Sequence, residues 1–191
     1  MGRFLVVVAL VLGISAPALA QGKKEARLDK GEVIVKTQEV DGFDIPKVTM
    51  EAVINAPPEK VWAIIDKCDD YVKTMKGLSY AKEISRKGNK IKCKTTADLP
   101  WPLDDLTATT LATHTVIPGK RWQRAWKLVE GDFEFNTGSW SLKHFKDDPN
   151  RTHVTYKVHV QPTTSLPDSV KAAAAKSTLP DLIAHLRSQV E

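Results

Sequence analysis

A long apolar stripe near the end of the chain constrains the fold more than any other feature. Between residues 166 and 190, apolar side chains recur at steps of three and four, the spacing of one helix face. Leu166-Pro167-Asp168-Ser169 suits a helix start, and Pro180 predicts a kink or two abutting helices. A stripe of this length must pack against a second layer. It comprises Val170, Ala173, Ala174, Leu179, Leu182, Ile183, Leu186 and Val190.

The second layer is predicted to be an antiparallel sheet, because apolar and polar residues alternate through the middle of the chain. Val48, Met50, Ala52 and Ile54 share one face of a first strand. The same period-two alternation recurs in later segments, between residues 78 and 160. A helix from Glu59 to Lys67 follows the first strand, and a second short helix is expected around residues 70–76. Six more strands are expected, at residues 78–84, 90–97, 106–116, 122–128, 133–145 and 152–160.

Alternation also predicts the faces of the last hairpin. A five-residue loop over residues 147–151 would pair Leu142 with Tyr156 and Trp140 with Val158. These large side chains then share one face, which we expect the C-terminal helix to cover. The opposite face, which we expect to be exposed to solvent, carries Ser139, Ser141, Lys143, His153 and His159.

Residues 1–20 have the three features of a secretory signal peptide. Met1-Gly2-Arg3 is a short positive start, residues 4–14 form an apolar run, and Ala18-Leu19-Ala20 is a small-residue cleavage site. The run is shorter than the roughly 20 residues that a membrane span needs. No cysteine follows the cleavage site, which argues against a lipoprotein. We therefore expect cleavage before Gln21 and a periplasmic or secreted protein.

The remaining organisation and the charge limit the partners. Residues 21–44 read as a polar leader with a possible short strand between Glu32 and Glu39, so the folded domain is expected over residues 45–191. The formal net charge is +5 at pH 7, and the lysines are scattered. This fits either a solvated basic face or transient contact with an anionic membrane surface. An exported chain rarely meets nucleic acid, so we expect no such partner, and we expect a monomer.

The chain has two cysteines, Cys68 and Cys93, and an oxidising compartment would permit a disulfide between them. Cys68 lies near a predicted helix end, and Cys93 lies in the strand over residues 90–97. Spacing alone does not decide whether the geometry of a bridge is possible. A disulfide and a pair of buried thiols therefore both stay open.

The order of the elements and several motifs resemble a known family. Pro100-Trp101-Pro102-Leu103, Gly138-Ser139-Trp140-Ser141-Leu142, Arg151-Thr152-His153-Val154-Thr155-Tyr156 and Leu179-Pro180-Asp181-Leu182 look like steroidogenic-acute-regulatory-related lipid-transfer (START) domains and their bacterial, polyketide-cyclase-like relatives. The resemblance covers roughly residues 45–190. It implies an α+β helix-grip fold, in which a curved antiparallel sheet of about seven strands wraps around the long C-terminal helix.

Two positions depart from the family pattern. The Arg-Asp pair that often follows the Pro-Trp-Pro element is Leu106-Thr107 here. The Asp-Pro-Gly-Gly sequence common before the last helix reads Gln161-Pro162-Thr163-Thr164-Ser165. The resemblance therefore supports the fold more strongly than the identity of a ligand.

The resemblance also implies a cavity between the sheet and the last helix that holds a lipid, sterol, polyketide or similar apolar molecule. A sheet curled around one helix readily leaves such an apolar pocket. The same side chains would equally be expected in a plain packed core. The apolar candidates for ligand binding are Ile91, Trp122, Trp126, Trp140, Tyr156, Leu182, Ile183 and Leu186.

Two charged residues are further candidates for ligand binding. Arg124 shares the face of Trp122 and Trp126, and Glu134 shares the face of Trp140 on the neighbouring strand. If both faces point inward, the two residues form a buried pair that could anchor the polar head of a ligand. The alternative is an edge position that leaves both residues solvated.

The sequence offers little for an enzyme. The five histidines form no helical pair at i, i+4, and neither a Gly-x-Ser-x-Gly motif nor a phosphate-binding glycine loop is present. We therefore predict no catalytic residue, metal or cofactor, although His114 could act as an acid or base in a cyclase-like pocket. The predicted function is an exported lipid-binding or lipid-transfer protein. The alternatives are a cyclase/aromatase- or hydrolase-like enzyme and a protein-binding module with a closed cavity.

Overall fold

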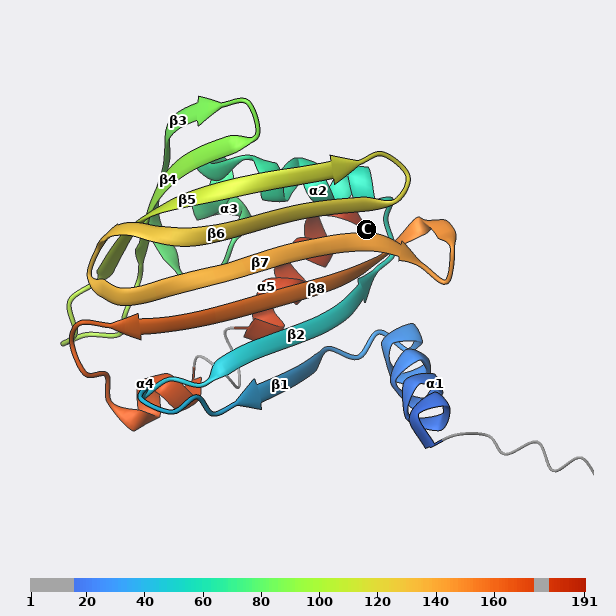
Figure 1. Ribbon diagram of the computed structural model, residues 1–191, viewed down its shortest axis with the longest axis horizontal. Helices are drawn as coiled ribbons and strands as arrows, with labels where there is room; N and C mark the ends of the chain where they lie inside the picture. Colours follow the sequence, from blue (N-terminus) through green and yellow to red (C-terminus); the bar gives the residue numbers. More distant parts are fainter. Residues whose placement is uncertain (1–15, 174–178) are drawn as a thin grey trace, which may run out of the picture.

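A single eight-stranded sheet forms the body of the protein (Figure 1). The computed structural model describes residues 16–173 and 179–191. The strands are β1 (Ile34–Gln38), β2 (Lys47–Ile54), β3 (Leu78–Lys87), β4 (Lys90–Ala97), β5 (Leu106–Ile117), β6 (Arg121–Gly131), β7 (Phe133–Phe145) and β8 (Asp148–Pro162). Their order across the sheet is β1-β2-β8-β7-β6-β5-β4-β3, and every neighbouring pair is antiparallel.

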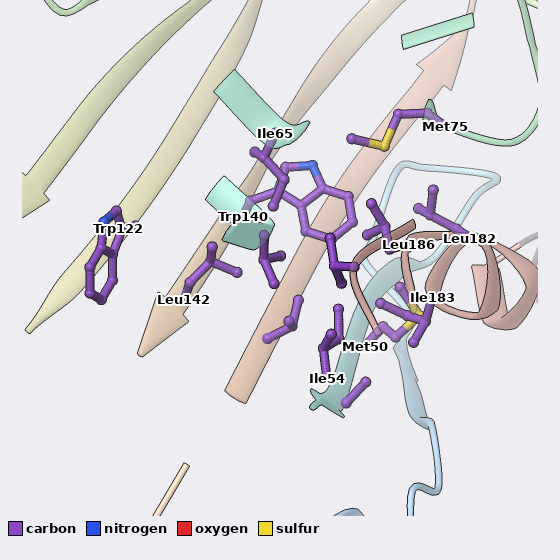
Figure 2. Close-up of a cluster of buried hydrophobic side chains, with 14 of the residues drawn as sticks. Met50, Ile54, Ile65, Met75, Trp122, Trp140, Leu142, Leu182, Ile183 and Leu186 are labelled. Atoms are coloured by element: carbon purple, nitrogen blue, oxygen red, sulfur yellow. The ribbon is translucent and has the colours of Figure 1, made fainter. Parts of the chain in front are cut away.

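Helices on one face of the sheet enclose the main core. In Figure 1, α2 (Pro58–Asp66), α3 (Tyr71–Thr74) and α5 (Leu179–Val190) lie behind the sheet, with the short helix η1 (Cys68–Asp70) between α2 and α3. This arrangement confirms the predicted α+β helix-grip fold. The predicted count of about seven strands becomes eight because β1 pairs with β2. Figure 2 shows the buried side chains that fill the core, among them Met50, Ile54, Ile65, Trp140, Leu142, Ile183 and Leu186.

The C-terminal stripe forms two helices in the described part of the chain, α4 (Asp168–Ala173) and α5. Pro180 is the second residue of α5, where its missing N–H needs no partner within the helix. Leu182, Ile183, Leu186 and Val190 are buried, as the stripe predicts. Ala174 belongs to the predicted stripe but lies outside the described residues. No helix in the described residues is long and apolar enough to span a membrane.

The predicted register of the last hairpin is wrong, but the predicted faces are right. Trp140 pairs with Tyr156 rather than with Val158. The strands are joined by a tight turn in which Lys146 and Asp147 have φ of 52° and 60°, conformations that favour a two-residue hairpin loop. The difference from the predicted pairing is an even number of residues, so each side chain keeps its face.

Helix α1 (Ala16–Asp29) replaces the expected polar leader and lies against the end of the sheet formed by β1 and β2 (Figure 1). It packs on the face opposite the main core. Val53 points to that face, whereas its neighbours Ala52 and Ile54 belong to the main core. A second, smaller core results, which comprises Leu28, Ile34, Val53 and Phe145.

The face predicted to be exposed to solvent is therefore partly covered. The side chain of His153 is only 13% exposed, and its Nε2 lies 3.1 Å from an oxygen of Glu51. His159 is buried between the rings of Phe43 and Phe135, at centroid distances of 4.6 and 5.0 Å. Strand alternation could not predict this cover, because α1 and the β1–β2 loop lie outside the alternating pattern.

Candidate ligand-binding cavity

A cavity of about 400 Å³ lies between the inner face of the sheet and the helices α3, α4 and α5. Strands β3 to β8 all contribute side chains to it, and most of these side chains are apolar. This volume falls within the range of small-molecule sites in proteins, which are mostly apolar with a few placed polar groups.

Three aromatic residues form one wall of the cavity. The ring of Tyr156 lies 4.4 Å from Trp140 and 5.9 Å from Trp126, between centroids. The indole Nε1 of Trp126 donates a hydrogen bond to Asn136 Oδ1 at 3.0 Å, which fixes the ring. Gly138 permits this arrangement, because a Cβ at that position would overlap the Trp126 ring. The wall is thus a rigid apolar surface.

A disulfide between Cys68 and Cys93 supports the neighbouring wall. The sequence left this pairing open, and the structure forms it with a Cα–Cα distance of 6.2 Å. The bond ties η1 to β4, and Cys93 itself lines the cavity. Tyr71 and Met75, which follow Cys68 in the chain, are buried and also line the cavity.

Arg124 is the one buried cation of the described cavity lining. It lies on β6 and is only 3% exposed. Its Nη1 lies 2.8 Å from Nε2 of His114 on the paired strand β5, and its guanidinium carbon lies 5.6 Å from the centre of the Tyr71 ring. These contacts hold the guanidinium at the inner, buried end of the cavity.

His114 connects Arg124 to a chain of charged side chains that reaches the surface. Its Nδ1 lies 3.0 Å from Asp66 Oδ1, and Asp66 also accepts a hydrogen bond from Arg86, which pairs with Glu83. Burial, and then the charge of Arg124, lower the pKa of His114 to about 4. The imidazole is therefore neutral at pH 7, with Nδ1–H donating to Asp66 and Nε2 accepting from Arg124.

The structure brings half of the predicted site residues to the cavity. The members that line it are Arg124, Trp126, Trp140, Tyr156 and Leu182. Four others are buried elsewhere, two on the sheet and two on α5, and fill the core rather than the cavity. These four are Ile91, Trp122, Ile183 and Leu186.

The predicted position of Glu134 on the inner face beside Arg124 is wrong. The register of β7 shifts between Phe133 and Phe135, and this irregularity turns Phe133 into the cavity and leaves Glu134 exposed. Glu134 is therefore not the partner of Arg124, which pairs with His114 instead. A bulge of this kind leaves no signal in simple alternation.

Several residues that line the cavity were not predicted from the sequence. Tyr71 and Met75 come from the short helical region after α2, whose orientation depends on the disulfide. Val170 lies on α4 and Leu166 lies two residues before this helix, where the apolar stripe did indicate a buried face but not a cavity.

The cavity opens toward α4 and the β4–β5 loop. Leu99, Phe133, Leu166 and Val170 line this end and are only half-buried, in contrast to the fully buried inner end. The β4–β5 loop also carries Trp101, whose side chain is 92% exposed, the most exposed large apolar residue in the described chain. In Figure 1 this loop and α4 lie at the same end of the molecule, away from α1.

Comparison with known proteins supports this architecture. Residues 54–187 match the family described as polyketide cyclase / dehydrase and lipid transport. No curated protein has a matching sequence. The structure is similar to that of a STAR-related lipid transfer protein from Xanthomonas axonopodis, with a TM-score of 0.69 and 17% identity over 81% of this chain and 93% of that chain.

Two further solved structures share the fold. Human StAR-related lipid transfer protein 5 has a TM-score of 0.70 and 16% identity over 91% of this chain and 93% of that chain. The Zhui aromatase/cyclase from Streptomyces has a TM-score of 0.57 and 16% identity over 75% of this chain and 92% of that chain. Family and fold together indicate a module that binds an apolar small molecule. The chain belongs to the polyketide cyclase / dehydrase and lipid transport family and has a START-like helix-grip fold.

Proposed function

We propose that the protein is an exported carrier that holds a lipid in this cavity and transfers it between membranes. The observation that carries the proposal is an apolar cavity of about 400 Å³ with one buried cation, Arg124, at its inner end. Each Å² of apolar ligand surface that the cavity removes from water favours binding by about 25 cal/mol. The aromatic wall would hold the apolar part of the ligand, and Arg124 would anchor its polar head.

Transfer requires that the open end of the cavity reaches a membrane, and the β4–β5 loop suits that contact. Trp101 is almost fully exposed, and Leu99 on the same loop lines the cavity. Tryptophan rings favour the interface between membrane and water. Lys76 and Lys171 also line the cavity and would face anionic headgroups. The proposal therefore includes transient docking of this end on an anionic membrane.

A transfer assay tests this function. Vesicles that carry a fluorescent lipid are mixed with unlabelled acceptor vesicles, and the protein should accelerate exchange well above the rate without protein. Trp101→Ser should slow this exchange while binding of the same lipid in vesicle-free solution is retained. Ile84→Ser, which alters another exposed apolar side chain on β3, is the matched control and should behave like the wild type. Absence of lipid binding by the wild type would refute the proposal.

Export rests on the signal-peptide features of residues 1–20 and is consistent with the disulfide, which oxidising compartments favour. Cleavage before Gln21 would remove the start of α1 but keep Lys24, which pairs with Glu51, and Leu28, which is buried. The test is the intact mass of the protein in the exported fraction. A chain that keeps its first twenty residues there would contradict the proposed cleavage.

A second candidate function is a cyclase-like reaction in the same cavity. Its support is the family description and the pair formed by His114 and Asp66, which lies behind Arg124 and outside the described cavity lining and has the geometry of a general base with its orienting carboxylate. However, the Nε2 atom that would accept a proton already accepts a hydrogen bond from Arg124. Recovery of a chemically altered ligand after incubation would favour the enzyme.

The cavity volume argues against the other alternative, a protein-binding module whose cavity has closed.

A further inference from the structure

The charges around the cavity are of one sign. The described side chains that line it include three cations, Lys76, Arg124 and Lys171, and neither Asp nor Glu. Lys171 forms an ion pair with Asp168 at 2.7 Å, and Lys76 is exposed to solvent. Arg124 is therefore the cation whose charge lies in the apolar interior.

Arg124 is not neutralised by its neighbours. Among the described residues, its only side-chain hydrogen bond is to His114, which is neutral at pH 7. Asp66 lies on the far side of the imidazole and already binds Arg86 at 2.9 Å. Burial raises the pKa of Tyr71, so the ring beside the guanidinium stays an uncharged phenol.

The guanidinium also keeps hydrogen-bond donors for a ligand. An arginine has five N–H groups, and the bond to His114 uses one of them. Arg124 is one of the residues that line the cavity, and no nitrogen of Arg124 is both fully enclosed and without a partner in the described structure. The remaining donors have no partner among the described residues and are available to a ligand in the cavity, and the fork geometry of a guanidinium matches an oxyanion with two oxygens.

We infer that the ligand is an amphiphile with one anionic oxyacid head, a carboxylate or a phosphate monoester, bound by Arg124 at the inner end of the cavity. This inference rests on the proposed function and specifies its ligand class. A buried charge without a partner is strongly unfavourable, and an anionic head would supply the missing counter-charge. A neutral head such as a hydroxyl or an ester would not. His114 is then a positioning residue, because its Nε2 holds the guanidinium toward the head.

Two probes of nearly equal shape test the inference. The fluorescent cis-parinaric acid and its methyl ester differ in the charge of the head, and each is titrated into the protein at pH 7. The wild type should bind the acid about tenfold or more tightly than the ester, the order expected for one hydrogen bond to a charged group. In Arg124→Gln this preference should vanish. The matched control is Arg121→Gln, an exposed arginine on the same strand, which should keep the wild-type preference.

The outcomes separate the inference from the proposed function. Equal affinity of the wild type for acid and ester overturns the inference but leaves a lipid carrier in place, whereas failure to bind either probe overturns the proposed function. If urea titration shows that Arg124→Gln is unfolded, the comparison of acid and ester on the wild type still tests the inference. Arg124→Lys, which keeps the positive charge, should then retain part of the preference for the acid. Displacement of the probe by dodecyl phosphate rather than lauric acid would assign the head to a phosphate.

Discussion

Loss of the Cys68–Cys93 disulfide should be the largest single perturbation of stability that leaves the sequence intact. The bond closes a loop with a sequence separation of 25 residues. The chain-entropy relation for a loop of this length gives about 3.5 kcal/mol at 25 °C. Because small domains are stable by only about 5–15 kcal/mol, reduction should remove a large share of the total.

The assay is urea unfolding of the oxidised protein and of the same protein after reduction, followed by tryptophan fluorescence. Reduction keeps both sulfur atoms in place, so the difference isolates the covalent bond from the packing of Cys68 and Cys93, which are 0% and 1% exposed. Thiol titration of the oxidised protein in denaturant should find no free thiol. The midpoint should fall, and the slope of the transition with urea should rise, because the reduced unfolded chain is less restricted and exposes more surface.

Two results would refute this reasoning. The first is a change of less than about 1 kcal/mol on reduction, which would mean that the unfolded chain is already restricted near these residues or that the bond is strained in the fold. The second is the recovery of two titratable thiols from protein taken directly from an oxidising compartment, which would show that Cys68 and Cys93 are not bridged.

Three further predictions follow from the packing and the charges. Gly138→Ala should lower the free energy of unfolding by about 1–3 kcal/mol and weaken ligand binding, because the new Cβ overlaps the Trp126 ring. Urea unfolding measures the first effect and probe titration the second. Because the pKa of His114 is lowered to about 4 from 6.5, its contribution to stability should be fully present above pH 6.5 and should be lost progressively as the pH falls toward 4. His114→Gln should flatten that part of the urea-unfolding profile against pH. Leu28→Ala should lower the free energy of unfolding by about 2–5 kcal/mol, because Leu28 on α1 is buried against the sheet. A change near zero would contradict the packing of α1 on the sheet.

Local periodicity was sufficient to predict the main body of the fold. The apolar faces of strands and helices repeat at fixed steps, so the inner position of Trp126, Trp140 and Tyr156 follows from the sequence. The burial of Leu182 and Leu186 on α5 follows in the same way. These residues needed only their spacing to be placed on the correct face.

The errors arise where a local irregularity or a distant contact decides the outcome. The register shift in β7 moved Glu134 to the surface, and the turn at Lys146 changed the hairpin pairing by an even step. The partner of Arg124 is His114 on β5, and this pair depends on the register between two strands. The packing of Leu28 depends on a helix that has no strong apolar stripe of its own.

The volume of the cavity could not be predicted for a similar reason. A core and a cavity use the same apolar residues, and Ile91 and Trp126 are alike in pattern although only Trp126 reaches the cavity. The difference depends on how far α4 and α5 stand from the sheet, which no spacing in the sequence encodes.

The central claim is that the protein carries a small amphiphile unchanged, and native mass spectrometry of the purified protein tests it most directly. The mass of the intact protein should show one adduct per chain, and organic extraction should release an apolar molecule with an acidic head. Incubation of the protein with that molecule should return it chemically unaltered. Protein that carries no adduct and takes up neither probe, or a molecule that is recovered in altered form, would contradict the account.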